Sequence, residues 1–222
     1  MSKTIIDFLS DLSANNNKSW FDANRLRYEN ARNELFTLVE QVIAGLNPLD
    51  PSIGNPDPKK CVFRQHRDVR FSKDKSPFKT NMGAFIVKGG KNSQNAGYYI
   101  HFEPGQSFVG GGIYAPMPDI LLALRKEIYY HAPQFKEIIY NPAFKAGFGE
   151  LMNEKLVNVP KTFPADFADA DLLKYKHYAV GRPFQPEMMS LADIHEFVME
   201  TFTLMIPFNH FLNEALINRE SH

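Results

Sequence analysis

The stretch GAFIVKGGKNSQNAGYYIHFEPGQSFVGGGIY, residues 83–114, contains three short runs rich in β-branched and aromatic residues. The runs span residues 83–90, 97–102 and 107–114, and the segments KNSQNA and EPGQ separate them. EPGQ has proline and glycine at the two central positions, as a type II turn favours. The stretch therefore predicts three consecutive strands joined by turns, which is an antiparallel meander.

The EPGQ turn also predicts which side chains share a face of the meander. If Glu103 pairs with Gln106, alternate residues of the two flanking strands lie on the same side. The side assigned to the core comprises Tyr98, Ile100, Phe102, Val109 and Ile113. The opposite side comprises Tyr99, His101, Phe108, Gly110, Gly112 and Tyr114. Because glycine has no side chain, the two glycines either leave a shallow depression beside Tyr99 and His101 or let a helix or the basic loop pack closely there.

Helical patterns precede the meander. A helix over about residues 4–14 is followed by NNN, in which Asn17 is placed to cap a second helix ending near Gly45. The apolar stripe of that second helix consists of Phe21, Tyr28, Ala31, Leu35, Leu38 and Val42. NPLDPSIGNPDP, residues 47–58, predicts a loop because of its prolines. KKCVFR, residues 59–64, predicts a further strand.

Helical patterns also follow the meander. A helix is expected from Met117, one or two more over residues 134–152, and another capped by Ser190, with Pro207 starting or kinking its successor. KLVNVP and HYAVGRPF, which begin at Lys155 and His177, predict short strands. The predicted architecture is α+β in a single domain over residues 1–222. A small antiparallel sheet, with the three-stranded meander at its centre, packs against the N- and C-terminal helices.

The composition is that of a globular protein, with 44% hydrophobic and 23% charged residues. No run approaches the roughly 18 apolar residues of a membrane helix, and Asp7 and Asp11 interrupt the apolar segment that a signal peptide requires. The single cysteine, Cys61, suits a reducing compartment. We therefore expect a cytoplasmic protein with no membrane partner. No motif assigns a metal site or a cofactor.

Positive charge is concentrated in FRQHRDVRFSKDKSPFKTN, residues 63–81. The formal net charge of the chain is zero, yet residues 59–79 hold eight basic residues and two acids, a local +6 that leaves −6 elsewhere. The two acids, Asp68 and Asp74, can each hold an arginine by paired hydrogen bonds. The surplus positive charge is then met by remote acids of the chain, by a small anionic ligand, or by nucleic acid.

The nucleic-acid alternative depends on the aromatic residues between these charges. Phe63, Phe71 and Phe78 could stack on the bases of a single strand. Against it, a neutral chain with one basic patch fits a compact ligand better than a polyanion. Nucleic acid is therefore the less favoured partner.

Four segments carry a resemblance: FLSDLSANNNKSWFDANRLRYENAR, RDVRFSKDKSPFKTN, YYIHFEPGQSFVGGGIYAP and VPKTFPADF. Together they resemble the uncharacterised bacterial and fungal protein family known as domain of unknown function 2461. The resemblance runs over nearly the whole chain and implies one α+β domain, without an established activity, cofactor or catalytic residue to carry over. The family's basic motif matches at Arg67, Asp68, Arg70, Phe71, Lys73, Asp74, Lys75, Pro77 and Lys79, with Phe78 where tyrosine is expected.

The leading hypothesis is a protein that binds a small phosphorylated or carboxylated ligand and, if it is an enzyme, acts as a hydrolase or transferase. His101 is the candidate general acid or base, because imidazole titrates near neutral pH. The candidate ligand-binding residues are Arg64, Arg67, Asp68, Arg70, Lys73, Asp74, Lys75, Lys79 and Tyr99. The alternative hypothesis is a non-catalytic module that binds single-stranded nucleic acid or an acidic protein surface.

Overall fold

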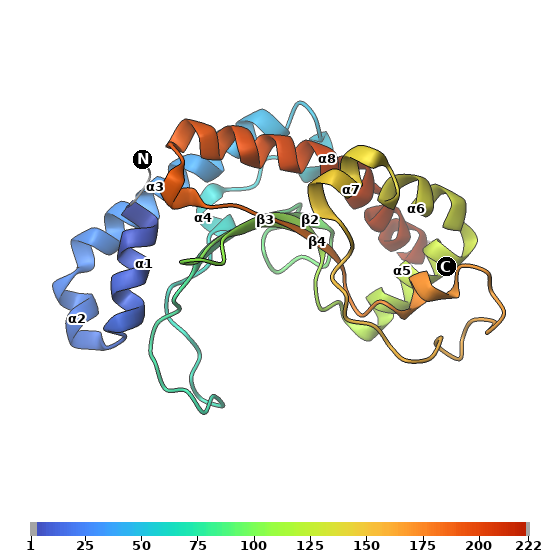
Figure 1. The fold of residues 1–222 in the computed structure, drawn as a ribbon, viewed down its shortest axis with the longest axis horizontal. Helices are drawn as coiled ribbons and strands as arrows, with labels where there is room; N and C mark the ends of the chain where they lie inside the picture. The colour runs from blue at the N-terminus through green and yellow to red at the C-terminus, as the bar shows by residue number, and fades with distance from the viewer. Residues whose placement is uncertain (1–3, 221–222) are drawn as a thin grey trace. The chain divides into compact units, whose positions relative to one another are not determined.

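Residues 4–220 are described by a computed structural model (Figure 1). The sheet has four antiparallel strands in the order β1-β2-β3-β4, formed by Met82–Ile86, Gly97–Phe102, Phe108–Ile113 and Tyr178–Pro183. The other regular elements are helices, so the α+β fold and its central meander are confirmed. Within the described residues, no helix has the length and apolar character needed to cross a membrane.

The contacts within the chain define two compact units, and each is described by itself. Unit 1 contains the chain up to Lys91, together with Tyr99–Val109 and Pro183–Glu200. Unit 2 contains Asn92–Tyr98, Gly110–Arg182 and the chain from Thr201 onward. Strands β2 and β3 and the C-terminal helix contribute residues to both units. A single domain over residues 1–222 stays a prediction.

The N-terminal helices of unit 1 begin where their capping residues predict. α1 is Thr4–Ala14, and Asn17 caps α2 (Lys18–Ala23) by accepting a hydrogen bond from Trp20 N at 3.0 Å. The prediction of one continuous helix to Gly45 is wrong, because the helix is interrupted between α2 and α3 (Arg25–Leu46). At the break, Asn24 has non-helical backbone angles and its Nδ2 donates to Trp20 O at 2.9 Å. Asparagine side chains compete in this way with the helical hydrogen bonds of the backbone.

The predicted strand at residues 59–64 is also wrong. After a short 3₁₀ helix, η1 (Pro51–Ile53), residues Pro58–Cys61 form the short helix α4. Asp57 caps this turn by accepting a hydrogen bond from Lys59 N at 2.9 Å, and proline at the first helical position favours a helix start. Bridge pairing begins only at Val62, which forms one antiparallel bridge with Ala84.

Residues 62–81, called the basic ribbon below, form two extended arms joined by a long loop (teal in Figure 1). The backbone groups that pair are Phe63 N with Gly83 O at 3.0 Å, Arg67 N with Pro77 O at 2.9 Å, and Lys79 N with Gln65 O at 2.8 Å. His66 and Phe78 form a further antiparallel bridge. This pairing shows that the arms are extended.

Strand β2 alternates as predicted. Tyr98, Ile100 and Phe102 are buried, whereas Tyr99 and His101 are half-buried on the other side. The turn that follows β2 also forms where EPGQ predicts it, with a hydrogen bond of 3.0 Å between the backbone groups of its first and last residues. The register of the meander therefore presents Tyr99 and His101 together on one face.

The glycines of β3 do not leave a depression. A Cβ atom built on Gly110 would lie 2.1 Å from Val180 O, and one built on Gly112 would lie 2.3 Å from Tyr178 O. The backbone of β4 occupies the space that side chains would need. Of the two alternatives for these glycines, close packing of another segment is confirmed, although that segment is a strand rather than a helix or the basic loop.

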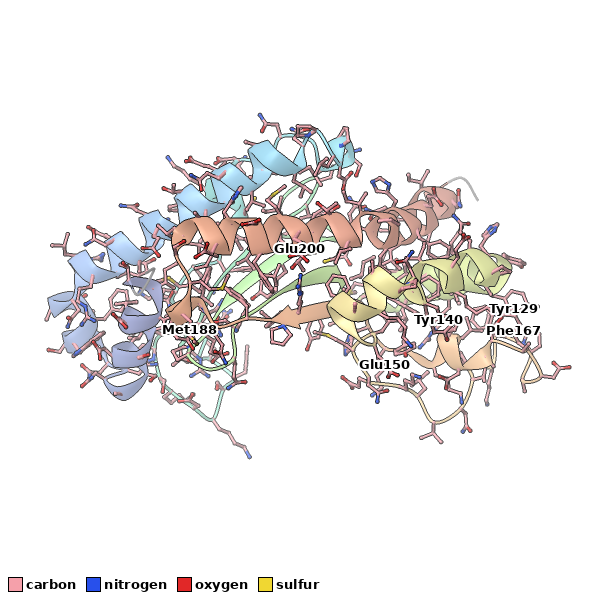
Figure 2. The ribbon with its side chains drawn as sticks, turned by 45° about the horizontal axis from the view of Figure 1, so that its top comes forward. Tyr129, Tyr140, Glu150, Phe167, Met188 and Glu200 are labelled. Atoms are coloured by element: carbon pink, nitrogen blue, oxygen red, sulfur yellow. The ribbon has the colours of Figure 1, made fainter. Side chains whose placement is uncertain are left out.

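Helices of unit 2 follow the meander as predicted: α5 (Pro118–Tyr130), α6 (Ala132–Ile139) and α7 (Pro142–Phe148). The ring of Phe135 packs against Phe208 and Phe211, with ring centroids 6.2 and 5.0 Å away. Figure 2 labels Tyr129 and Phe167, whose ring centroids lie 4.8 Å apart. This second contact fastens the irregular segment after α7 to α5.

Of the two strands predicted in the second half of unit 2, one is confirmed and one is wrong. HYAVGRPF contains β4, but KLVNVP is not a strand, since only Lys155 forms a bridge, with Tyr175. Between these two segments lies the 3₁₀ helix η2 (Ala170–Lys174). Short apolar runs such as KLVNVP become strands only where a neighbouring strand is available, and the sequence does not contain that information.

Helix α8 (Leu191–Glu220) follows the short 3₁₀ helix η3 (Pro186–Met188) and begins with a reciprocal cap. Asp193 N donates to Ser190 Oγ at 3.1 Å, and Asp193 Oδ2 accepts from Ser190 N at 3.0 Å. The capping role predicted for Ser190 is therefore confirmed. Pro207 lies inside the helix, so it does not start a new one.

Candidate functional site

The basic ribbon is anchored to the N-terminal helices through Phe78. Its ring is 3% exposed and stacks on Phe21 with centroids 3.9 Å apart. The side chain of Asn16 binds the same residue at both backbone groups, accepting from Phe78 N at 3.1 Å and donating to Phe78 O at 2.9 Å. Across the ribbon, Gln65 Nε2 donates to Asn81 O at 3.2 Å. These contacts hold both arms in place.

Two arginines of the ribbon pair with the two acids of the same segment. Arg70 forms two hydrogen bonds with Asp68, at 2.9 and 2.6 Å, and Arg67 pairs with Asp74. Hydrogen bonds from the backbone and hydroxyl of Ser76, and from Arg67, lower the pKa of Asp74 to about 2. Hydrogen bonds from Arg70 also lower the pKa of Asp68. Both acids are thus ionised at neutral pH, and each is already paired with an arginine of the ribbon.

The ribbon's other cations have no such partner. Among residues 4–218, the ion pairs of the ribbon are confined to these two, so the alternative in which remote acids pair with its surplus cations is not borne out. Near the tip, Lys73 is exposed and Lys75 Nζ donates to Val69 O at 3.0 Å. The remaining cations, Arg64 and Lys79, lie on the two arms.

Those two cations line a small pocket at the base of the ribbon. Its volume is about 120 Å³, and its lining residues are Phe63, Arg64, Lys79, Asn81, Gly83 and Tyr99. All six belong to unit 1. The pocket therefore lies between the basic ribbon and Tyr99 of β2.

A third cation approaches the pocket from the turn after β1. Lys91 Nζ lies 5.8 Å from the ring centroid of Phe63 and donates to Val62 O at 3.0 Å, while Lys79 Nζ lies 5.3 Å from the same centroid. Partial burial lowers the pKa of Lys79, and the positive charges of Arg64 and Lys91 lower it further. Two like charges, Lys79 and Lys91, thus lie at one partly buried aromatic ring, with Arg64 close enough to affect Lys79, and the described residues place no carboxylate in an ion pair with any of the three.

Beside the pocket, the side chains of Tyr99, His101 and Glu103 form a chain of hydrogen bonds. Tyr99 Oη lies 2.9 Å from His101 Nδ1, and His101 Nε2 lies 3.0 Å from Glu103 Oε2. Phe108 stacks on the imidazole with centroids 4.8 Å apart, and Thr80 Oγ1 donates to Glu103 Oε1 at 3.4 Å. The line follows the period of two residues along a strand, which brings every second side chain to one face.

The direction of these hydrogen bonds follows from the chemistry of the end groups. An ionised carboxylate only accepts, so Glu103 requires a proton on His101 Nε2. A neutral imidazole then has a lone pair on Nδ1, which accepts the hydroxyl proton of Tyr99. Burial raises the pKa of Tyr99 to about 12, with a further contribution from the charge of Glu103. The phenol therefore keeps its proton at neutral pH.

The structure separates the predicted site residues into two groups. Arg64, Lys79 and Tyr99 meet at the pocket, whereas the other candidates lie along the ribbon toward its tip: Arg67, Asp68, Arg70, Lys73, Asp74 and Lys75. His101 does not line the pocket, and both of its ring nitrogens are engaged. It reaches the pocket only through Tyr99.

Sequence reasoning missed two parts of this arrangement: Lys91, and Glu103 as a partner of His101. Lys91 directly follows two glycines, and a lysine after a turn is ordinarily solvated, so only the pairing of β1 with the ribbon brings it to Phe63. Glu103 could have been found from the sequence, because it lies two residues beyond His101 on a predicted face.

The family model described as "Conserved hypothetical protein (DUF2461)" matches residues 4–211. No curated protein and no solved structure matches the chain. The matched range includes the basic ribbon, the pocket and the line from Tyr99 to Glu103.

Proposed function

The chain belongs to the DUF2461 family, whose description specifies no activity, and from its own residues we propose that it binds a small anionic ligand in the pocket of Arg64, Lys79 and Tyr99. The ligand is phosphorylated or carboxylated, and an enzymatic function would be that of a hydrolase or transferase. We further propose that the protein acts in the cytoplasm, where its one cysteine is kept reduced.

One observation carries this proposal: the cations at the pocket are not neutralised by the described part of the chain. Like charges at short range disfavour one another, and partial burial weakens the screening by water that would relieve them. Lys79 feels both effects, because its pKa is lowered by burial and by the charges of Arg64 and Lys91. A bound anion would relieve both, so ligand binding and the unusual placement of these charges have one explanation.

The choice of a small ligand follows from the size of the pocket. A volume of about 120 Å³ accommodates a phosphate or carboxylate group with little else, so the rest of a larger ligand would lie outside. The two lining cations, with Lys91 beside them, suit a doubly charged phosphate better than a singly charged carboxylate, since the attraction scales with the product of the charges. Within the proposal, a phosphate monoester is therefore the preferred ligand.

The first prediction concerns the cations of the pocket. The double variant Arg64→Gln, Lys79→Met keeps the length of both stems but removes both charges, and we expect it to bind inorganic phosphate and phenyl phosphate at least about tenfold more weakly. A hydrogen bond to a charged group contributes about 1.5–3 kcal/mol, and about 1.4 kcal/mol corresponds to tenfold in affinity. Isothermal titration calorimetry at low salt measures the difference.

The matched control removes two cations from the same segment outside the pocket. Lys73→Met, Lys75→Met changes the net charge by the same amount, and it should bind phosphate as the unchanged protein does. Equal weakening in both double variants would mean that only the overall charge matters, and the pocket would not be the binding site. Absence of phosphate binding by the unchanged protein would refute the proposal outright.

A second candidate function has its own observation in its favour. Phe71, near the tip of the ribbon, is 95% exposed and lies beside Arg70 and Lys73. An exposed aromatic ring among cations can stack on a base of single-stranded nucleic acid or contact an acidic protein surface. Phe78 cannot serve in this way, because it is buried against Phe21, and Phe63 forms part of the pocket wall. One stacking ring of the three predicted therefore remains available.

The second prediction tests this alternative. If the tip binds nucleic acid, Phe71→Ala should weaken binding of labelled single-stranded DNA about fivefold or more, because stacking contributes about 1–3 kcal/mol per base. Leu26→Ala, which removes another exposed apolar side chain, should have no effect. Fluorescence anisotropy at two salt concentrations makes the measurement, and binding that is absent or independent of salt rules out the tip as a nucleic-acid site.

A further inference from the structure

Tyr99 lines the pocket in which the proposed phosphate would bind. A Cβ atom built on Gly83 would lie 2.7 Å from Tyr99 Oη, so the hydroxyl lies directly over a residue without a side chain. Gly83 and Tyr99 both line the pocket together with Arg64 and Lys79. Because Gly83 has no side chain, the hydroxyl of Tyr99 can lie over its backbone, between two residues that line the pocket with those cations.

The hydrogen bonds of Tyr99 leave its lone pairs free. In the described residues, His101 Nδ1 is the one hydrogen-bond partner of Tyr99 Oη, and in the neutral tautomer that carries its proton on Nε2 it accepts the hydroxyl proton. The lone pairs of the oxygen are then available to an electrophile in the pocket. A hydroxyl whose proton is held by a histidine, and whose oxygen is free, is the arrangement of an activated nucleophile.

The third group completes that arrangement. A nucleophile–base pair is effective when another residue holds the base in one orientation and tautomer, the part that a carboxylate plays in hydrolase triads. Here Glu103 Oε2 accepts from His101 Nε2 at 3.0 Å, and the ring of Phe108 stacks on the imidazole. His101 is thereby fixed with its basic nitrogen toward the phenol.

We propose that Tyr99 is the nucleophile of a phosphoryl-transfer reaction on phosphate monoesters, with His101 as its general base and Glu103 as the residue that positions His101. The proposal rests on the proposed function, since the pocket cations must first hold the phosphate. Phosphoryl transfer has a loose transition state in which positioning and charge stabilisation supply most of the catalysis, so a phenol oxygen held in line suffices as the attacking atom.

The reaction balances in two steps. In the first, Tyr99 Oη bonds to phosphorus, the ester P–O bond breaks, the leaving oxygen departs with its electron pair, and the tyrosine proton moves to His101 Nδ1. In the second, a water oxygen bonds to the same phosphorus, the bond from phosphorus to Tyr99 breaks, and His101 returns its proton to the phenol. The attacking water releases one proton to solvent, from which the departed oxygen takes up a proton to become the alcohol. The products are the alcohol and inorganic phosphate. An alcohol in place of water makes the protein a transferase.

The test uses the full chain with p-nitrophenyl phosphate as the probe. We expect release of nitrophenolate, and after rapid acid quenching we expect the intact mass to rise by one phosphoryl group that peptide mapping places on Tyr99. Tyr99→Phe should lower kcat about 1,000-fold or more, as loss of a nucleophile does. It should still bind inorganic phosphate by calorimetry, because it keeps the pocket cations and the ring contacts with Phe63 and Phe108.

Two further variants define the other roles. His101→Gln should lose turnover to a similar extent, whereas Glu103→Gln should lower kcat with little change in KM, because it leaves the phosphate-holding cations intact. Tyr114→Phe removes the hydroxyl of an exposed tyrosine and should be unaffected in turnover and labelling. A general loss of structure would lower phosphate binding as well, so the calorimetric control distinguishes it from the loss of a catalytic group.

The outcomes separate the two proposals. If the unchanged protein binds phosphate but shows no turnover or no phosphoryl group under rapid quenching, the nucleophile is overturned and the anion site stands. Turnover by Tyr99→Phe within tenfold of the unchanged protein, or a phosphoryl group on another residue, also overturns it. If phosphate does not bind at all, the anion site itself fails, and calorimetry reveals this before any kinetic experiment.

Discussion

Replacement of Gly112 by alanine is expected to destabilise the protein by about 3 kcal/mol or more. The new Cβ atom would lie 2.3 Å from Tyr178 O and 2.9 Å from Phe208 Cε1, and the first of these atoms belongs to the backbone of β4. Overpacking of this kind costs about 1–3 kcal/mol. The φ angle of +94° at Gly112 adds backbone strain of about 1–3 kcal/mol for a residue with a side chain.

Two other glycines separate the contributions to this effect. Gly105 has a φ angle of +73° with open space around it, so alanine there introduces backbone strain alone. Gly110 has no left-handed φ angle, but its Cβ atom would lie 2.1 Å from Val180 O, so alanine there introduces a steric clash alone. Urea unfolding of the three single variants should rank Gly112→Ala as the most destabilised and Gly105→Ala as the least. If Gly105→Ala and Gly110→Ala are equally mild, β4 does not restrict β3 as described.

The meander could be predicted because its signals are local. Alternation along GYYIHF and the proline-glycine pair after it determine strand, turn and register within about a dozen residues. The partner of the β3 glycines is not local, since Val180 and Tyr178 lie far along the chain. The glycines of β3 therefore predicted either close packing of another segment or a depression in the surface. Only the position of β4 decides between the two.

The errors at α4 and KLVNVP have a related cause. A short apolar run is compatible with a strand, a helical turn or an irregular segment, and its neighbours decide the outcome. For α4 the deciding signal was present in the sequence, since Asp57 and Pro58 form a helix start. For KLVNVP no local signal contradicts a strand, and only the lack of a pairing partner beyond Lys155 shows that none forms.

Counting charges in the sequence predicted a surplus of positive charge in residues 59–79, but not which of these cations remain unpaired. The ion pairs of Asp68 and Asp74 with nearby arginines follow from sequence proximity, and they account for the local acids. The position of the unpaired charges depends on the anchoring of the ribbon and on Lys91, which comes from outside it. For this reason the sequence proposed eight ligand-binding residues along the whole segment together with Tyr99, whereas only three of these nine line the pocket.

The anchor of the ribbon leads to the second large effect, which is expected for Phe21→Ala. Phe21 is 2% exposed, stacks on Phe78 at 3.9 Å, and has further ring contacts with Tyr28 and His66 at 5.0 and 6.0 Å. Truncation of a buried phenylalanine to alanine costs about 3–5 kcal/mol. Because Phe78 directly precedes Lys79 and pairs with His66, the loss should also loosen the pocket.

Phe21→Ala should therefore reduce both the free energy of unfolding and the affinity for phosphate, although Phe21 is not a lining residue of the pocket. Phe36→Ala supplies the control. Phe36 is a half-buried residue of α3 whose ring packs against Arg32, and it has no ring contact with the ribbon. It should lower stability less and leave phosphate affinity unchanged. Phe21→Leu refills most of the volume and should restore part of both losses. Unfolding in urea and calorimetry on the same samples make the comparison. Phosphate affinity that survives Phe21→Ala under folded conditions would mean that the ribbon holds its cations in place without the ring stack.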